Sequence, residues 1–300
     1  MIADMRADLD LNELTLTKLF ADLTKSDYKL DEATLNKSNI LFAFKPATPV
    51  KTSKTTDTVL AKPSAMAVLV NQLNLADNTI QFDNLAAKPT ATGMDFNHLK
   101  IKSLGLGAEN LSYSAAGIKV NVKSGTLKEK SGFELSKLQG DVIYNDKQIK
   151  LSNLIFKTPN TNIENNTELN FTSMDDLTKH PERVKLSLQV KNSTLGLKDG
   201  TYFSNAIPAN YRNEKIRVTA KVNGYMNNLS IPQLQVNGLK STHIDVTGTV
   251  KGLPDVNKTF LDLNIKQFSL TKSDLLVVIP KKNFTNQYRT AQQDCSEWSV

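Results

Sequence analysis

Apolar and polar side chains alternate with a period of two along most of this chain. The clearest run is IRVTAKVN, and the same alternation recurs elsewhere (residues 216–223 for the first run, then 118–122, 184–190, 244–250 and 261–265). Successive side chains of a β-strand point to opposite faces, so this period predicts strands with one apolar face and one face in water. Short polar or glycine-bearing breaks such as SAAG and NDKQ separate the runs. The spacing predicts a meander of antiparallel hairpins.

The alternation loses its phase at two places, within ELSKL (134–138) and LSNL (151–154). A slip of one residue would turn the following apolar side chains to the wrong face of the sheet. A β-bulge or a kinked corner at Ser136–Lys137 and at Ser152–Asn153 restores the facing, and bulges bend and twist a sheet. The sequence therefore predicts a curved sheet.

The composition is that of a folded, water-exposed protein. Of 300 residues, 39% are hydrophobic and 22% are charged, which is too apolar for a disordered chain and too polar for a membrane bundle. No run approaches the roughly 18 apolar residues of a spanning helix, and the first residues lack the pattern of a signal peptide. The net charge of +7 comes from scattered lysines. This distribution favours a solvated lysine face over nucleic-acid binding, with mild attraction to anionic lipid headgroups as the second choice.

Three segments depart from the strand pattern. Around residues 173–180 we expect a short helix, because Ser173 can cap it, Asp176 follows three residues later, and Pro181 can stop it. Residues 46–63 are rich in proline and threonine, which predicts an exposed loop. Residues 284–300 lose the alternation and are expected to form a disordered tail. Residues 1–283 are then expected to form one elongated, repetitive β-sheet region.

No arrangement of residues indicates catalysis, a cofactor or a metal. The chain contains none of the common phosphate-loop, nucleophile-elbow or zinc-helix motifs, and its three histidines (His98, His180 and His243) have no ligand spacing. Cys295 is the single cysteine, so no internal disulfide can form. We expect a protein that is not an enzyme, without catalytic residues, metal ligands or cofactors.

Two long stretches of the chain resemble a known family. They are GMDFNHLKIKSLGLGAENLSYSAAGIKVNVKSGTLKEKSGFELSKLQGDVIYNDKQIKLSNLIFKTPNT (93–161) and IPQLQVNGLKSTHIDVTGTVKGLPDVNKTFLDLNIKQF (231–268). Both are similar to the translocation and assembly module subunit TamB of the AsmA-like superfamily, in the form found in Bacteroidetes-type bacteria. The intervening FTSMDDLTKHPERVKLSL is similar to the same family. The resemblance covers most of residues 9–280 and lies in each run as a whole.

The resemblance implies an all-β fold: an elongated antiparallel sheet curled into a taco-shaped half-pipe with an apolar groove. It further implies a periplasmic protein with an inner-membrane anchor and an Omp85-type outer-membrane barrel as partner. Such proteins carry phospholipid between the two membranes and support outer-membrane protein translocation and assembly. The anchor helix and the family's C-terminal domain do not match any part of this chain, so we expect an internal fragment.

An open half-pipe would expose a long apolar strip, which calls for an apolar client such as phospholipid acyl chains. The wall of such a groove needs only apolar side chains at alternate positions of each strand, so we expect no distinctive functional group in the sequence. The candidate groove-lining residues are Ile118, Val120, Leu135, Val142, Tyr144, Ile149, Leu151, Ile216, Val218, Val222, Ile244 and Val246. With roughly 20 strands about 4.7 Å apart, the sheet would extend on the order of 90 Å.

The alternation alone does not exclude a fold in which two sheets pack face to face. In a β-sandwich the apolar faces of two sheets bury each other with the same sequence pattern. The alternative prediction is therefore a repetitive β-sandwich that serves as a binding or adhesin module of the cell surface. Overall shape separates the two, because sandwich modules have sealed cores and the half-pipe is one extended open sheet.

Overall fold

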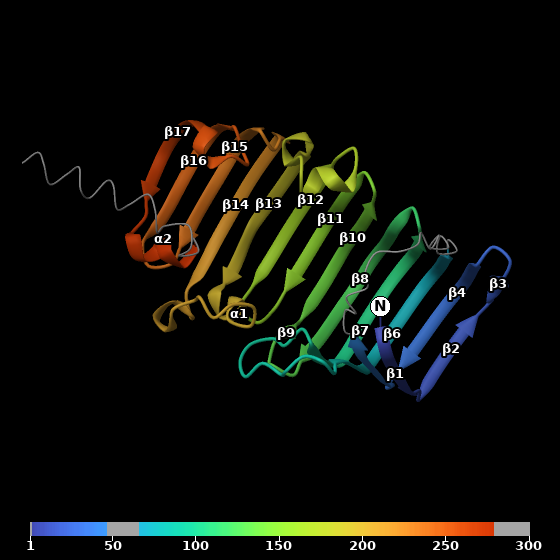
Figure 1. Cartoon of the computed structure of the whole chain (residues 1–300). Helices are drawn as coiled ribbons and strands as arrows, with labels where there is room; N and C mark the ends of the chain where they lie inside the picture. Colours follow the sequence, from blue (N-terminus) through green and yellow to red (C-terminus); the bar gives the residue numbers. More distant parts are fainter. Residues whose placement is uncertain (1, 47–65, 279–300) are drawn as a thin grey trace, which may run out of the picture.

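The computed structural model describes residues 2–46 and 66–278, which form one open β-sheet of 17 strands (Figure 1). The predicted tail (284–300) and the predicted loop (46–63, apart from Pro46, which ends a strand) lie outside the described residues. No second sheet covers the first within the described part of the chain. The predicted fold class, an elongated antiparallel sheet curled into a half-pipe, is confirmed except for two parallel pairings, and the β-sandwich arrangement is not what these residues adopt.

Most of the sheet is a simple antiparallel meander. It runs through β6 (Ala67–Asn84), β7 (His98–Ser114), β8 (Gly117–Glu129), β9 (Glu134–Leu135), β10 (Lys137–Asn145), β11 (Gln148–Lys157), β12 (Asn162–Asn170), β13 (Lys185–Gly196), β14 (Lys215–Tyr225), β15 (Asn228–Gly238), β16 (Thr242–Lys251) and β17 (Phe260–Ser269). From β10 to β17 each strand pairs with the next, and both β9 and β10 pair with β8. Short turns join β7 to β8, β10 to β11, β14 to β15 and β15 to β16, as the hairpin pattern predicts, whereas longer loops follow β6, β12 and β13.

The N-terminal strands add a feature that the sequence pattern did not predict. They are β1 (Ile2–Asp10), β2 (Glu13–Thr17), β3 (Phe20–Asp22), β4 (Asp27–Asn36) and β5 (Asn39–Pro46). Both β4 and β5 pair with β6 in parallel, whereas every other pairing is antiparallel. Strands β4 and β5 lie one after the other along the same side of β6. Together they resemble one long strand that is interrupted at Lys37–Ser38.

A buried polar corner bends this region. Ser38 and Asn78 are fully buried side chains. The Ser38 backbone N–H donates to Asn78 Oδ1 (3.0 Å), and Asn78 Nδ2 donates to the Leu35 carbonyl oxygen (2.7 Å). Lys37, Asp77 and Ser103 all have positive φ near this bend, on three neighbouring strands. At this corner the sheet bends, so that β1, β5 and the second half of β6 lie at an angle to β4 and the first half of β6.

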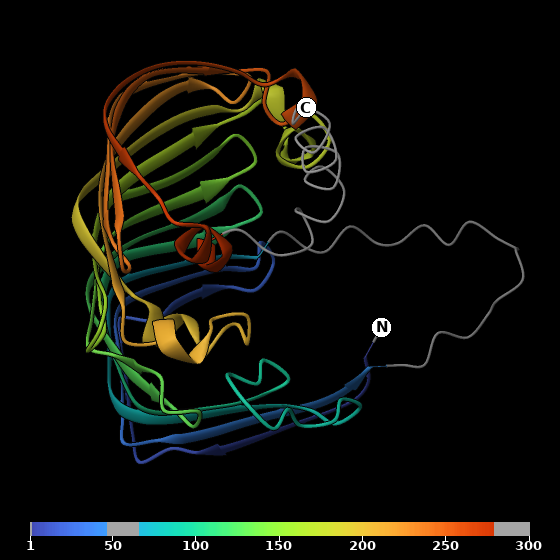
Figure 2. The ribbon, with the colours of Figure 1, turned by 90° about the vertical axis from the view of Figure 1, so that its left-hand side faces the viewer.

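The whole sheet curves into a half-pipe that is open along one side (Figure 2). Register shifts within the strand pairs show where extra residues are inserted, and one lies between Leu151 and Leu154, as predicted. Ser136 separates β9 from β10 along the chain, so the strand breaks where the corner is predicted. Because a bulge adds a residue to one strand only, each insertion bends and twists the sheet locally.

Helices are few and short. The predicted helix around 173–180 is a single 3₁₀ turn, η1 (Met174–Leu177), where Asp176 accepts the backbone N–H of Ser173 (3.2 Å). Pro181 begins a second turn, η2 (Pro181–Arg183), instead of stopping the helix. The expectation of one short helix was too low, because α1 (Leu197–Gly200), η3 (Ala209–Tyr211), η4 (Val256–Lys258) and α2 (Lys272–Val278) are also present.

The sheet is shorter than the sequence estimate. Strands β2 and β3 both pair with β4, β1 and β5 lie beside the meander, and β9 shares β8 with β10. Seventeen strands therefore occupy 13 successive positions, which span about 60 Å at the usual strand spacing. The estimate on the order of 90 Å assumed that every strand added to the length.

Candidate functional site

The most extended feature of the molecule is a row of apolar side chains that crosses 13 strand positions. Residues paired directly across a ladder point to the same side of the sheet. Following the pairs from β3 to β17 gives a row in which only glycine lacks an apolar side chain. We call it the apolar row: Ala21, Tyr28, Val68, Tyr113, Ile118, Tyr144, Ile149, Leu169, Leu186, Gly224, Leu229, Val250 and Leu261.

The adjacent row on the opposite face is polar. One residue along each strand, the pairs run through Phe20, Lys29, Leu69, Ser112, Lys119, Ile143, Lys150, Glu168, Ser187, Asn223, Ser230, Thr249 and Asp262. Only three members are apolar. Lys150 Nζ lies 3.1 Å from a Glu168 carboxylate oxygen, and Ser187 Oγ donates to Asn223 Oδ1 (3.1 Å). The two faces therefore differ sharply in chemistry.

The apolar face is the concave one. Helix α2 lies inside the curve of the half-pipe, near the end formed by β17 (Figures 1 and 2). Its Asp274 carboxylate accepts a hydrogen bond from Thr242 Oγ1 (2.9 Å), so the Thr242 side chain points to that side. Alternate residues of a strand share a face, and Ile244 and Val246 therefore point into the concave side as well.

All twelve predicted groove-lining residues lie on this concave face. Ile118, Tyr144 and Ile149 belong to the apolar row itself, and the others extend the same face further along their strands (Val120, Val142, Leu151, Val222, Val218, Ile216, Ile244, Val246 and Leu135, which pairs with Leu127). Burial follows depth: Val246 is 4% exposed near the middle of its strand, and Tyr144 is 41% exposed beside a hairpin turn. Side chains crowd together in the middle of a concave sheet, which explains this gradient.

The sequence reasoning missed one part of the wall. Tyr28, Val68 and Tyr113 on β4, β6 and β7 continue the apolar row beyond the residues predicted. Their strands show the period of two, but the parallel pairing of β4 with β6 joins residues about 40 positions apart and leaves no local signal. Hairpin order alone could not place them on the same face.

Apolar side chains remain open to water at both ends of the concave face. On β17, Leu261 and Ile265 are each 56% exposed, and on β2 Leu14 and Leu16 are also exposed. Leu261 is the last member of the apolar row, and Leu14 and Leu16 pair with β4 at the opposite end of the sheet. Soluble monomers rarely expose long apolar surfaces unless they bind something with them.

A chain of amide side chains follows the convex face and accounts for many of the asparagines. Asn110 Nδ2 donates to Asn121 Oδ1 (3.0 Å), and Asn121 Nδ2 donates to Asp141 Oδ1 (2.8 Å). The backbone N–H of Asn153 donates to Asn166 Oδ1 (2.7 Å). Asn110 and Asn153 have positive φ at bulges, a conformation that asparagine tolerates better than most residues. These asparagines therefore hold the curvature.

Helix α2 is anchored through a buried carboxylate. Asp274 accepts hydrogen bonds from Tyr211 Oη (2.7 Å), the Ser241 backbone N–H (3.0 Å) and Thr242 Oγ1. Burial raises the pKa of Asp274, but these hydrogen bonds outweigh it and hold the pKa below its usual value. The ionised carboxylate thus fixes α2 beside η3 and the start of β16.

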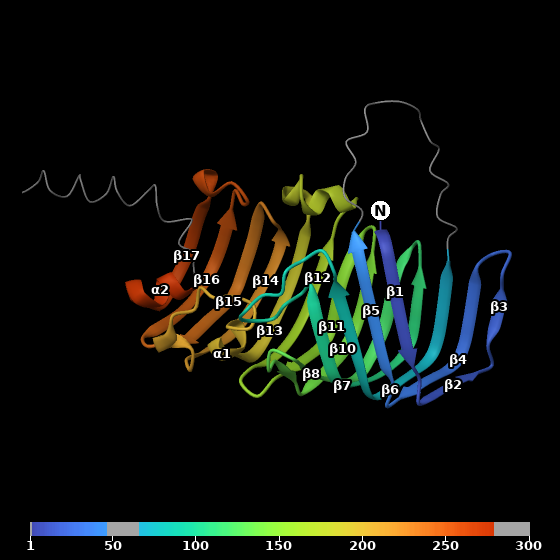
Figure 3. The same cartoon turned by 60° about the horizontal axis from the view of Figure 1, so that its bottom comes forward.

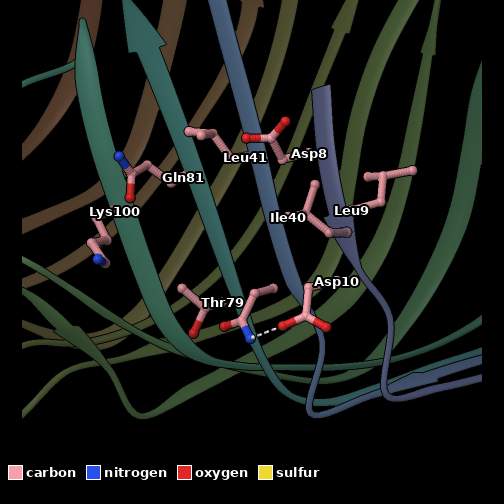
Figure 4. Close-up of a pocket in the computed structure, with 9 residues that line it drawn as sticks. Asp8, Leu9, Asp10, Ile40, Leu41, Thr79, Gln81 and Lys100 are labelled. Atoms are coloured by element: carbon pink, nitrogen blue, oxygen red, sulfur yellow. Dashed lines mark hydrogen bonds between the residues drawn. The ribbon is translucent and has the colours of Figure 1, made fainter. Parts of the chain in front are cut away.

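Elsewhere the described residues offer little for chemistry. A pocket of about 280 Å³ lies between β1, β5, β6 and β7, and Asp8, Asp10, Leu41 and Lys100 are among its lining residues (Figure 4). Its lining contains no serine, cysteine or histidine. Over residues 2–46 and 66–278, no group of three potential metal ligands comes together. Within those residues, too, no helix is long and apolar enough to cross a membrane.

Comparisons with known proteins give no match: no family model, no curated protein and no solved structure is similar to this chain. The geometry of the concave face therefore carries the functional argument.

Proposed function

We propose that this chain is a segment of a TamB/AsmA-like protein of the periplasm, and that its concave face carries phospholipid between the inner and outer membranes. The observation that supports the proposal is the apolar row, which continues from β3 to β17 with only aliphatic or aromatic side chains and one glycine. Its polar counterpart on the convex face would remain in water. A surface of this kind is matched by acyl chains, which need apolar contact and no directional bonds.

The energetics favour such a wall. Each CH₂ group exposed to water costs about 0.8 kcal/mol, so two acyl chains of ~16 carbons cost on the order of 25 kcal/mol when a lipid leaves a membrane. A row about 60 Å long exceeds one acyl chain, since two opposed leaflets together measure roughly 30 Å. Several lipids would therefore lie one after another along the concave face, and each would exchange one apolar contact for the next.

The resemblance to TamB adds a second duty, the support of outer-membrane protein translocation and assembly. The open edge of β17 is a feature suited to it. This strand pairs only with β16 among the described residues, and Phe260, Leu261 and Phe268 on it are exposed. An unpaired strand edge with exposed apolar side chains can accept a strand from a client chain. An Omp85-type barrel as partner remains part of the proposal, and a catalytic role is not proposed.

Lipid that co-purifies with the protein tests the proposal. Native mass spectrometry and lipid extraction are applied to protein purified without harsh detergent, alongside Val218→Asp on the concave face. Phospholipid on the unmodified protein and little on the folded variant is the expected result. A folded, lipid-free protein would refute lipid carriage and would favour the alternative, a binding or adhesin module.

A further inference from the structure

Three loops from distant parts of the sequence meet at one rim of the half-pipe. They follow β6 (residues 85–97), β8 (130–133) and β13 (197–206, including α1), and we call them the rim cluster (Figures 2 and 3). The Met94 backbone N–H donates to the Tyr202 carbonyl oxygen (2.7 Å), and Tyr202 Oη donates to the Gly132 carbonyl oxygen (3.1 Å). The three loops are thus joined into one structure.

An aromatic group forms the centre of the rim cluster. Phe133 is buried, and its ring packs edge-on against the rings of Tyr202 and Phe203, with centroids 5.7 Å and 5.4 Å away. Phe203 also stacks with Phe96 from the first loop, at 6.4 Å. Yet Phe96 is 60% exposed and Phe203 is 54% exposed. Two phenylalanines from different loops are therefore held side by side, and each is more than half exposed.

The charges of the rim cluster are sorted by sign. Every carboxylate in these loops is turned inward and buried: Asp95 accepts the backbone N–H groups of Thr90 (2.9 Å) and Asn97 (3.1 Å). Asp199 accepts from Asn160 Nδ2 (2.9 Å) and from two threonine hydroxyls. The exposed charged side chains of the loops are all lysines (Lys88, Lys130 and Lys198). The outer surface of the cluster is consequently apolar and positively charged.

We propose that the rim cluster docks onto the surface of an anionic phospholipid bilayer, with Phe96 and Phe203 entering the interface and the three lysines facing the headgroups. Exposed aromatic side chains and lysines on the same group of loops are a combination that binds peripheral proteins to such membranes. Charge complementarity selects a bilayer with negative headgroups. The inference rests on the proposed function in one respect: docking at this rim would bring the concave face next to the membrane that supplies its lipid.

The test is co-sedimentation of the whole chain with vesicles, either of phosphatidylcholine alone or of phosphatidylcholine mixed with phosphatidylglycerol. We expect binding to the mixed vesicles, weak binding to phosphatidylcholine alone, and loss of binding at high salt. Phe96→Ser/Phe203→Ser and Lys88→Gln/Lys130→Gln/Lys198→Gln should each weaken binding by about tenfold or more. The matched control is Phe20→Ser, since Phe20 is 54% exposed on β3, away from the cluster.

The outcomes separate this inference from the proposed function. Unchanged binding of both variants, or equal and salt-insensitive binding to the two kinds of vesicle, overturns docking at the rim. Because Phe203 contacts Phe133, the single change Phe96→Ser serves as the second variant if the double change lowers stability. Lipid that co-purifies with a variant that no longer sediments would uphold lipid carriage alone. Sedimentation of a protein that never holds lipid would uphold docking alone.

Discussion

A charge placed on the concave face should abolish lipid binding, whereas the same charge one residue away should not. Val222 lies opposite Leu188 on the concave face, and Asn223 lies opposite Ser187 on the convex face. Val222→Asp removes an apolar contact worth about 1.5–3 kcal/mol and sets a carboxylate against the acyl chains, which costs a few kcal/mol unless the group is paired. Together the two terms come to about 4–6 kcal/mol, which corresponds to roughly 10³- to 10⁴-fold weaker binding.

Asn223→Asp is the matched control. It adds the same charge to the same strand, and a carboxylate oxygen can still accept the hydrogen bond from Ser187 Oγ. The assay is transfer of a fluorescent phospholipid from donor vesicles to each protein, with circular dichroism to confirm that the sheet is intact. Should Val222→Asp unfold the sheet, Tyr144→Asp at the exposed rim replaces it. Equal lipid binding by the concave and convex variants would refute the assignment of the face.

Three further predictions concern the elements that shape and close the concave face. Asn153 has φ near 53°, so Asn153→Ala should lower the free energy of unfolding by about 1 kcal/mol in urea titrations, and Asn153→Gly should be nearly neutral; equal losses would show that conformation is not the cause. Asn78→Ala leaves two backbone groups of the buried corner without partners and should cost about 2–4 kcal/mol by the same titration, whereas a loss below 1 kcal/mol would contradict the role of the corner. The pKa of Asp274 is lowered in the folded protein, so its contribution is present above the unfolded value of about 3.9 and is lost as pH falls through the lower folded value. Hydrogen exchange should therefore show that α2 is protected at pH 5 and loses protection only in stronger acid. In Asp274→Asn, α2 should be unprotected under both conditions. Protection of α2 that changes neither with acid nor with this substitution would contradict the role of Asp274 as an anchor.

The sequence was enough to predict the strands and the parity of their side chains. A period of two states which residues share a face within a strand, and hairpin turns carry that parity from one strand to the next. All twelve predicted wall residues were placed together for this reason. The phase breaks at 134–138 and 151–154 gave the positions of a corner and a bulge because an inserted residue is visible as a shift in the pattern.

Other features depend on contacts between distant residues and left no periodic signal. The parallel pairing of β4 and β5 with β6 is one, and it shortened the sheet relative to the estimate. Helix α2 is held by Asp274 against Tyr211 and Thr242, more than 30 residues away in each case. The asparagines at bulges also looked like ordinary polar residues, since their role depends on backbone conformation and on partners across the sheet.

The most direct test of the central claim places a photoreactive amino acid at one of four neighbouring positions, in four separate variants that are each incubated with phospholipid vesicles. Tyr144 and Ile149 pair on the concave face, and Ile143 and Lys150 pair on the convex face one residue away. After illumination with phospholipid vesicles, mass spectrometry should find lipid adducts at Tyr144 and Ile149 and few at Ile143 and Lys150. Adducts of equal yield at all four positions, or at the convex pair alone, would contradict the assignment of the concave face as the path for lipid.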